Sequence, residues 1–278
     1  MWGAMFRAML DEVIRLSGLP EEVLLPEFRA IHQRHGTAEY AFAIQELPSL
    51  RAKHPGADIK ALYDPAMHAY YRARKMTLVL YPGVEETLLE IHNRGCRLVA
   101  YTESMAFYSA SRLRYLGLDE LIDFMYSPAD HELPRDMRPE DIRQYPADYY
   151  VMRRTQQRQT PKGELKPNPD ILRTILQDLG SEPRNTIYVG DSKMKDIVMA
   201  NQVGVTSVWA EYGIAQHTTD YQLLRQVTHW SDEDVQRERL ISEGVGVDEK
   251  DLAPALTIQT FGELLDAFEF DSPGEEGR

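Results

Sequence analysis

Apolar residues recur at helical spacing through the first quarter of the chain. Met5, Met9, Val13 and Leu16 would lie on one face of a helix, and Gly18 and Pro20 would end it. Further helical patterns cover residues 26–35, 39–47 and 65–75. No convincing strand pattern occurs before about residue 77. Residues 1–78 are therefore predicted to form an α-helical unit.

The pattern then changes to short apolar runs that alternate with helical segments. Strands are predicted at residues 96–102, 121–126, 186–189, 206–210 and 256–260. Helices are predicted at 87–93, 105–116, 169–179, 196–203 and 261–268, the first four stopped by Gly95, Gly117, Gly180 and Gly204. Strands that alternate with helices predict an α/β fold, with a Rossmann-like parallel sheet covered on both faces. This core would span residues 79–270, followed by a disordered tail at 271–278.

Residues 128–165 interrupt the alternation and are predicted to be a long insertion loop. They contain five prolines, and no element is clear beyond a segment at 148–154. A connection of this length is often functional or mobile. Basic residues gather at its end against a single acid, Glu164: Arg153, Arg154, Arg158, Lys162 and Lys166. They could attract an anionic substrate, or they could simply form a solvated loop.

Composition restricts the possible partners. The 278 residues carry a formal net charge of -13, which disfavours nucleic-acid binding. No apolar run is long enough to cross a membrane, and the charged residues among 1–16 favour an amphipathic helix over a signal peptide. The single cysteine, Cys96, excludes an intrachain disulfide and is interpreted as a structural thiol. A cytoplasmic protein fits these features.

Two segments could handle an anion at the carboxyl ends of strands, where open parallel sheets bind ligands. Thr102 ends a predicted strand, and its hydroxyl and the following backbone N–H groups, beginning at Glu103, could hold a phosphate oxygen. The alternative is that Thr102 merely caps the next helix. Lys166 is followed by Pro167, and Pro169 sets the start of the next helix. These prolines stiffen the backbone, so the ammonium of Lys166 could be held in one direction to neutralise a phosphate. The alternative is an ordinary surface lysine.

A third segment, Tyr188-Val189-Gly190-Asp191, gives the strongest chemical signal. The apolar strand runs directly into Asp191, which places this carboxylate at the sheet edge. Asp196 falls in the first turn of the next helix. One interpretation is that it simply complements the helix dipole. Carboxylate oxygens suit a hard cation such as Mg²⁺, so Asp191 and Asp196 are the candidate metal ligands.

In this order, the three segments resemble the later motifs of the haloacid dehalogenase (HAD) superfamily of hydrolases. Thr102, Lys166, Asp191 and Asp196 match a strand-ending threonine, a lysine before a helix, and a Gly-Asp motif with a second aspartate. The similarity covers roughly residues 79–270. It implies a Mg²⁺-dependent phosphatase that acts on a small phosphorylated substrate, with Thr102 and Lys166 as catalytic and phosphate-binding residues. It also implies that the helical first quarter is a cap domain.

One part of the family pattern is not matched. The resemblance implies an Asp-x-Asp motif at the end of an early strand, whose first aspartate attacks phosphorus, and no segment of this chain fits. Asp232 and Asp234 have the spacing but begin a polar helix. We therefore expect the native protein to start upstream of Met1, with a further strand between those at 96–102 and 186–189, and the chain as written to be inactive.

Other interpretations follow from the same residues. A non-catalytic relative could use the HAD fold to bind a phosphorylated ligand or a protein partner, and dehalogenation is a third possibility. Within the cap, His32, Arg34 and His35 are candidates for substrate contact, with ordinary surface helix residues as the alternative. The pattern indicates neither the substrate nor the oligomeric state.

Overall fold

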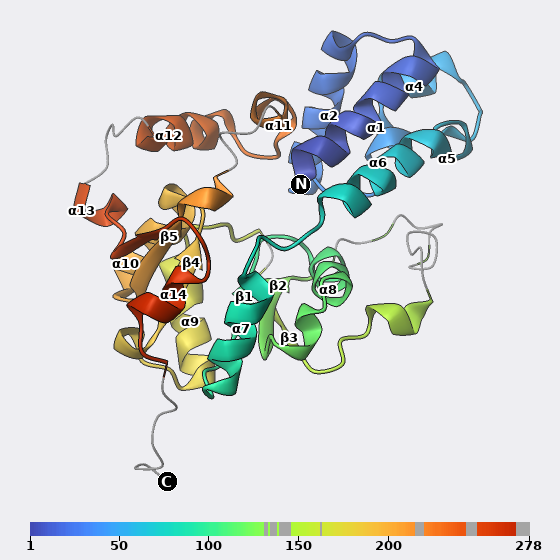
Figure 1. Cartoon of the computed structure of the whole chain (residues 1–278). Helices are drawn as coiled ribbons and strands as arrows, with labels where there is room; N and C mark the ends of the chain where they lie inside the picture. The colour runs from blue at the N-terminus through green and yellow to red at the C-terminus, as the bar shows by residue number, and fades with distance from the viewer. Residues whose placement is uncertain are drawn as a thin grey trace. The chain divides into compact units, whose positions relative to one another are not determined.

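The computed structural model describes residues 1–130, 133, 138, 146–161, 163–214, 220–242 and 249–270. The chain divides into two compact units (Figure 1). A helical unit comprises Met1–Val79 and Ala215–Gln236, and an α/β unit comprises Leu80–Ile214 and Arg237–Arg278. The predicted tail at 271–278 and Lys162 of the predicted basic patch lie outside the described residues.

The helical unit is built around α1. Its helices are α1 (Trp2–Ser17), α2 (Glu21–His35), α3 (Ala43–Glu46), α4 (Pro48–Lys53), α5 (Ile59–Leu62), α6 (Asp64–Thr77), α11 (Tyr221–Val227) and the start of α12 (Asp232–Ser242). The predicted face of α1 is confirmed, because Met5, Met9 and Val13 are buried. Gly18 ends the helix with φ 66°, a left-handed conformation that a residue with a side chain adopts at a cost.

Two features of this unit differ from the sequence prediction. Helix α2 begins at Glu21 and contains Pro26, where the pattern predicted a helix from residue 26. Leu24, Leu25 and Phe28 are buried, and this apolar face outweighs the one backbone hydrogen bond that a proline removes. Residues 215–236, predicted within the α/β core, group with the helical unit instead.

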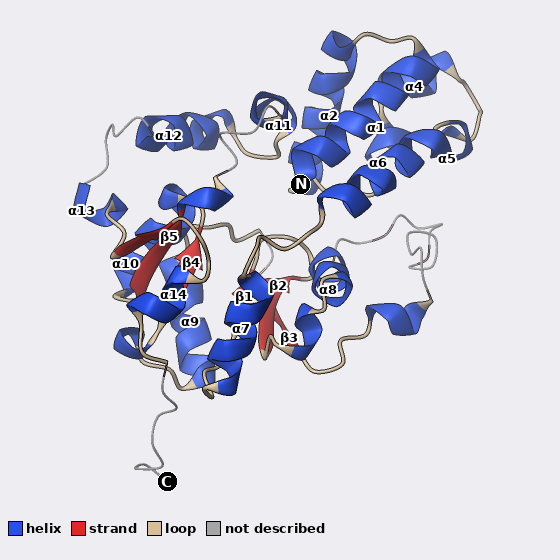
Figure 2. Cartoon of the chain, in the orientation of Figure 1, coloured by secondary structure: helices blue, strands red, loops and turns tan. Residues whose placement is uncertain are grey.

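The α/β unit contains parallel strands and flanking helices (Figure 2). Its strands are β1 (Val99–Tyr101), β2 (Phe124–Pro128), β3 (Gln156–Thr160), β4 (Ile187–Gly190), β5 (Thr206–Ala210) and β6 (Leu256–Ile258). Its helices are α7 (Val84–Asn93), α8 (Ala106–Tyr115), α9 (Pro169–Leu179), α10 (Val198–Val203), α13 (Glu249–Leu252) and α14 (Glu263–Ala267). The α/β class and the parallel pairing predicted from the sequence are confirmed.

The strands form two three-stranded sheets, ordered β1-β2-β3 and β4-β5-β6. All four pairings are parallel. Among the described residues, β1 and β4 are thus each at the edge of a sheet, paired on one side only. The two sheets nevertheless share hydrophobic clusters, since Leu98 beside β1 packs in the same cluster as Ile187 and Val189 of β4.

Alternation along the strands places helices on both faces. On β4, Ile187 and Val189 pack with Ile91 of α7 and Leu264 of α14. Tyr188, between them in sequence, packs with residues of α9 and α10 on the other face. Successive side chains of a strand point to opposite faces, so the predicted coverage on both faces is confirmed at this strand.

The insertion at 128–165 is where the strand prediction was wrong. Strand β3 lies within it and pairs with β2 along its whole length. Its sequence, Gln-Gln-Arg-Gln-Thr, carries no apolar signal, because β3 is an edge strand whose side chains are mostly exposed. The predicted strand at 121–126 also begins later, at Phe124, because residues 118–120 form a 3₁₀ turn.

In the part of the chain that is described, no helix combines the length and the apolar character needed to cross a membrane.

Candidate active site

Lys166 links the end of β1 to the turn that follows β4. Its ammonium donates hydrogen bonds to the carbonyl oxygen of Tyr101 and to Oδ1 of Asp196, both at 3.1 Å. Only 13% of the Lys166 side chain and 8% of the Asp196 side chain are exposed. A buried ion pair leaves a costly unpaired charge if either partner is removed. The lysine is therefore not the ordinary surface residue that the sequence left as an alternative.

The carboxylate of Asp196 is held by several donors. Tyr188 donates its hydroxyl to Oδ1 at 3.2 Å, and the backbone N–H of Ser192 donates to Oδ2 at 3.2 Å. Asp196 lies in a π-helical turn, Lys193–Ile197, that precedes α10. Gly190 faces this carboxylate so closely that an added Cβ would lie 2.3 Å from Cβ of Asp196. A side chain at position 190 would thus collide with Asp196, so packing requires the glycine at the end of β4.

Glu103 positions two lysines at once. Its Oε1 accepts the backbone N–H of Lys166 at 2.6 Å, and its Oε2 accepts the ammonium of Lys195. The sequence prediction used only the backbone at Glu103, for binding phosphate, and no contact tests that role. The side chain instead ties the segment after β1 to the segments before α9 and after β4. All three predicted segments therefore meet at one place.

Thr102 lies at the carboxyl end of β1, as predicted. Its backbone N–H donates to the carbonyl of Tyr126 at 3.0 Å, which extends the pairing of β1 with β2. Its hydroxyl oxygen accepts the backbone N–H of Ser104 at 3.0 Å. The side chain of Ser104 in turn accepts a hydrogen bond from Arg112 at 2.9 Å. The hydroxyl of Thr102 thus stabilises the turn into α8, and its capacity to bind phosphate stays a prediction.

Asp191 is the carboxylate of the cluster that reaches the surface. Surrounding protein atoms remove part of its water, and this loss together with the negative charge of Asp196 raises the pKa of Asp191. The indole N–H of Trp209 donates to its backbone carbonyl at 3.1 Å. Gly213 packs closely against its side chain, where an added Cβ would lie 2.9 Å from Cβ of Asp191. Two carboxylates that repel each other in this way would be stabilised by a cation.

Two tyrosines in the site were missed by the sequence prediction. The ammonium of Lys166 lies 4.6 Å from the ring centroid of Tyr101 and 5.5 Å from that of Tyr188. Burial raises the pKa of Tyr101 to about 12. Burial, and then the charge of Asp196, raise the pKa of Tyr188 well above its usual value. Both phenols stay protonated at neutral pH, so Tyr188 remains a hydrogen-bond donor to Asp196.

The other candidate residues have structural partners. His32 is buried, with 1% of its surface exposed, and its Nδ1 lies 2.6 Å from the carbonyl of Val227. Arg34 and His35 both pair with Glu46. For His32 the alternative of an ordinary surface residue is therefore wrong, because its ring belongs to the core of the helical unit. Substrate contact by these three residues stays a prediction.

The acidic pair near residue 232 and the basic patch also have local partners. Asp232 pairs with Arg29. The carboxylate of Asp234 accepts hydrogen bonds from the backbone N–H and the hydroxyl of Ser231 at the start of α12. Of the basic patch, Lys166 joins the site, whereas Arg153 and Arg158 pair with nearby carboxylates. Among the residues that the structure describes, no group of three or more histidine, cysteine, aspartate or glutamate side chains could hold a metal ion.

Comparison with protein families gives one match that covers most of the chain. Residues 6–204 match the model for haloacid dehalogenase-like hydrolases. That range contains Thr102, Lys166, Asp191 and Asp196, the residues whose surroundings are described above.

Curated relatives are similar at low identity. A glyceraldehyde 3-phosphate phosphatase of Methanopyrus kandleri is 27% identical over 203 residues, which is 73% of this chain and 71% of the relative. The pyrophosphatase PpaX of Halalkalibacterium halodurans is 26% identical over 48% of this chain and 47% of its own. A phosphoglycolate phosphatase of Haemophilus influenzae is 28% identical over 48% of this chain and 46% of its own. The chain thus spans about half the length of the last two.

Among solved structures, a 2-haloacid dehalogenase from Pseudomonas syringae aligns over 95% of this chain and 88% of its own, with 15% identity and a TM-score of 0.45. A HAD phosphatase from Thermococcus onnurineus aligns over 74% of this chain and 90% of its own, with 20% identity and a TM-score of 0.35.

Proposed function

Since the chain belongs to the haloacid dehalogenase-like hydrolases, we propose that it is a Mg²⁺-dependent phosphatase acting on a small phosphate ester. The observation that supports this most strongly is the buried contact of Lys166 with Tyr101, at the end of β1, and with Asp196, in the turn after β4. A fixed ammonium at that place can neutralise charge that develops on a phosphoryl group. Curated relatives named as phosphatases of small metabolites support the same substrate class.

The charge of the site is the physical argument for a metal ion. Glu103, Asp191 and Asp196 supply three carboxylates against the ammonium groups of Lys166 and Lys195, which leaves one net negative charge. A phosphate ester adds further negative charge, so its binding requires another cation. Mg²⁺ usually takes one or two protein carboxylates and completes its shell with water and substrate phosphate. Asp191 fits as the direct ligand, with Asp196 as a ligand through water or a positioning residue.

The chain's own residues would divide the work around that ion. Bound Mg²⁺ would supply positive charge to the phosphoryl oxygens. Thr102 would donate its hydroxyl to one of those oxygens, and Lys166 would neutralise the attacking group and the phosphate together. Glu103 and Tyr188 would hold Lys166 and Asp196 in place through the contacts already present.

A phospho-aspartyl intermediate is the route we propose. An aspartate would attack phosphorus and break the bond between phosphorus and the ester oxygen, so that the alcohol leaves. Water would then hydrolyse the acyl phosphate. The attacking aspartate is not assigned among the described residues of this chain. The helical unit would act as the cap that selects the substrate and excludes water, in a cytoplasmic setting.

The proposal is tested on the full-length protein expressed from its gene. Phosphate release from a panel of small phosphate esters should require Mg²⁺ and should stop when EDTA is added. Asp191→Asn should lower the Mg²⁺-dependent rate by about 10²-fold, the scale of one lost electrostatic contact. Asp266→Asn, which removes a charge from an exposed position on α14, should retain the parent rate. A Mg²⁺-dependent rate that survives Asp191→Asn would contradict the assignment.

Calorimetry gives a second readout that does not depend on turnover. With two carboxylates as the protein's contribution, we expect Mg²⁺ to bind weakly without substrate. Asp191→Asn should abolish that binding, and Asp266→Asn should not. Tight binding that Asp191→Asn leaves unchanged would place the metal elsewhere.

A further inference from the structure

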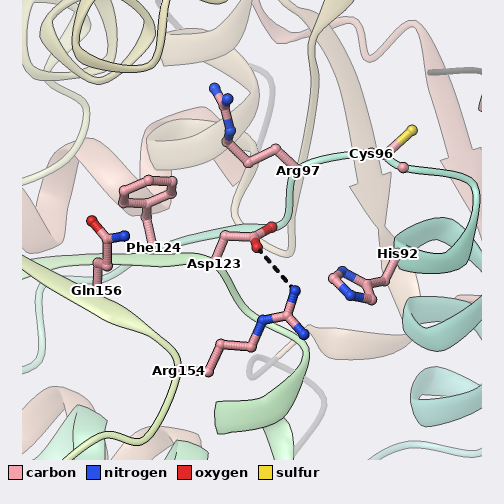
Figure 3. Close-up of a pocket in the computed structure, with 8 residues that line it drawn as sticks. His92, Cys96, Arg97, Asp123, Phe124, Arg154 and Gln156 are labelled. Atoms are coloured by element: carbon pink, nitrogen blue, oxygen red, sulfur yellow. Dashed lines mark ion pairs between the residues drawn. The ribbon is translucent and has the colours of Figure 1, made fainter. Parts of the chain in front are cut away.

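A pocket of about 330 Å³ opens at the amino-terminal edge of the sheet β1-β2-β3 (Figure 3). Arg97 lies two residues before β1, Asp123 immediately precedes β2, Arg154 lies two residues before β3, and Gln156 begins β3. Because these strands are parallel, their first residues meet at one edge. Thr102 follows the last residue of β1 at the opposite edge, so this pocket is separate from the candidate active site.

Several polar side chains in this pocket make no hydrogen bond to the described part of the protein. The guanidinium of Arg154 forms an ion pair with Oδ1 of Asp123 at 3.9 Å, which is too long for a hydrogen bond. The side-chain amide of Gln156 has no partner among the described residues. Nδ1 of His92 is buried and likewise lacks a partner there. The side chain of Arg154 is 51% exposed and Gln156 is also exposed, so water can satisfy both. Nδ1 of His92 is the buried group among them, and buried polar groups are rarely left unpaired.

The rest of the lining is held in place by the fold. Oδ2 of Asp123 accepts the backbone N–H of Leu98 at 2.8 Å, which fixes the carboxylate between the first two strands. Arg97 donates to the carbonyl of Leu179 at 2.5 Å and lies 5.9 Å from the ring of Phe124. In Figure 3 the guanidinium of Arg154 points into the space between Asp123 and His92. Asp123 and Arg97 are thus positioned before any ligand arrives.

Charge indicates what the pocket would accept. Arg97 and Arg154 against Asp123 leave one net positive charge in the lining, in a chain whose formal net charge is -13. Guanidinium groups pair well with carboxylate and phosphate oxygens. The volume is near the lower end of ligand pockets, which suits an ion of phosphate size or a metabolite with few heavy atoms.

We propose that this pocket binds a small oxyanion, a phosphate or carboxylate group, between the guanidinium of Arg154, the amide of Gln156 and the ring of His92. The bound oxyanion would take the place of Asp123 as the partner of Arg154. The site does not depend on the proposed phosphatase activity, since it uses none of the residues at the carboxyl ends of the strands.

Calorimetric titration of the full-length protein with inorganic phosphate, and separately with citrate, tests the proposal and distinguishes phosphate from carboxylate ligands. Arg154→Gln should weaken binding of the preferred ion about tenfold or more, the effect of losing one charged hydrogen bond. Arg153→Gln is the matched control. It removes the same charge one residue away, at a side chain that is 69% exposed and paired with Glu120, and it should bind like the parent.

Two further variants make the result decisive. Lys166→Gln removes the cation of the candidate active site, so the binding that depends on Arg154 should persist in it. Gln156→Ala should weaken binding in the same direction as Arg154→Gln, and thermal melts would verify that both variants are folded. Parental affinity in Arg154→Gln, loss of all binding in Lys166→Gln, or no binding of either ion in the millimolar range would each overturn the proposal.

Discussion

Acidification should destabilise the helical unit through one buried histidine, His32. Its ring packs against Trp2, Phe6 and Phe28, with centroids 6.3, 6.1 and 5.9 Å away. Burial is the main cause that lowers the pKa of His32 from 6.5 to about 4. The hydrogen bond to Val227 raises this pKa, and the charges of nearby histidines lower it further. The folded protein therefore resists a proton that the unfolded chain accepts.

The sign and size follow from linkage between protonation and folding. Between pH 6.5 and about 4 the unfolded state binds more protons at this site, so stability falls as the pH falls. With about 1.4 kcal/mol for each unit of pKa difference, the loss is about 2 kcal/mol at pH 5 and about 3 kcal/mol at pH 4. These are sizeable fractions of a typical folding stability of about 5–15 kcal/mol.

Urea unfolding at pH 7 and pH 5, followed by circular dichroism, measures the effect. His32→Gln removes the titrating ring, so its loss of stability between the two pH values should be smaller than the parent's by about 2 kcal/mol. His68→Gln is the control, because the side chain of His68 is 66% exposed, and its pH dependence should match the parent's. Equal pH dependence in the parent and in His32→Gln would refute the reasoning.

Two further predictions concern a buried carboxylate and a close contact of helix α1. Asp119 is buried and accepts a hydrogen bond from the backbone N–H of Arg153 at 2.8 Å. Asp119→Asn should therefore lower stability by about 1–3 kcal/mol, measured in thermal melts. Glu120→Gln is the control and should not lower stability, because the side chain of Glu120 is 66% exposed. Burial opposes ionisation of Asp119, but its hydrogen bonds outweigh burial and lower its pKa, so this contribution should disappear as the pH falls below about 4. At Gly3 an added Cβ would lie 2.4 Å from Cβ of Asp220. Gly3→Ala should therefore destabilise the protein by about 1–3 kcal/mol, although alanine has the better helix propensity, and a second substitution, Asp220→Gly, should restore the stability. A Gly3→Ala protein as stable as the parent would show that this contact relaxes freely.

Much of the site could be predicted because strand ends in a parallel sheet converge. Thr102, Lys166 and Asp191 each follow or precede an element whose pattern is visible in the sequence, and their segments do meet. The tyrosines could not be predicted in the same way. Tyr101 and Tyr188 belong to strands far apart in sequence, and only the packing of β1 near β4 brings both to Lys166.

The fold was predictable where burial produces a periodic pattern and unpredictable where it does not. The apolar pattern of strand β5, which has two adjacent buried residues, predicted the strand at its observed bounds. Edge strand β3 is polar and was missed, since hydrogen bonding to β2, and not burial, defines it. The assignment of residues 215–236 to the helical unit depends on contacts with segments nearly two hundred residues away, such as that between His32 and Val227. No local pattern carries that information.

The steady-state rate of p-nitrophenyl phosphate hydrolysis by Lys166→Ala tests the central claim most directly. In the full-length protein, loss of the ammonium that lies 3.1 Å from Asp196 should lower the rate by about 10²-fold or more, in a variant whose thermal melt shows that it is folded. Arg184→Ala removes a cation from a side chain that is 80% exposed, and it should keep the parent rate. A folded Lys166→Ala protein that hydrolyses the ester at the parent rate would contradict the account.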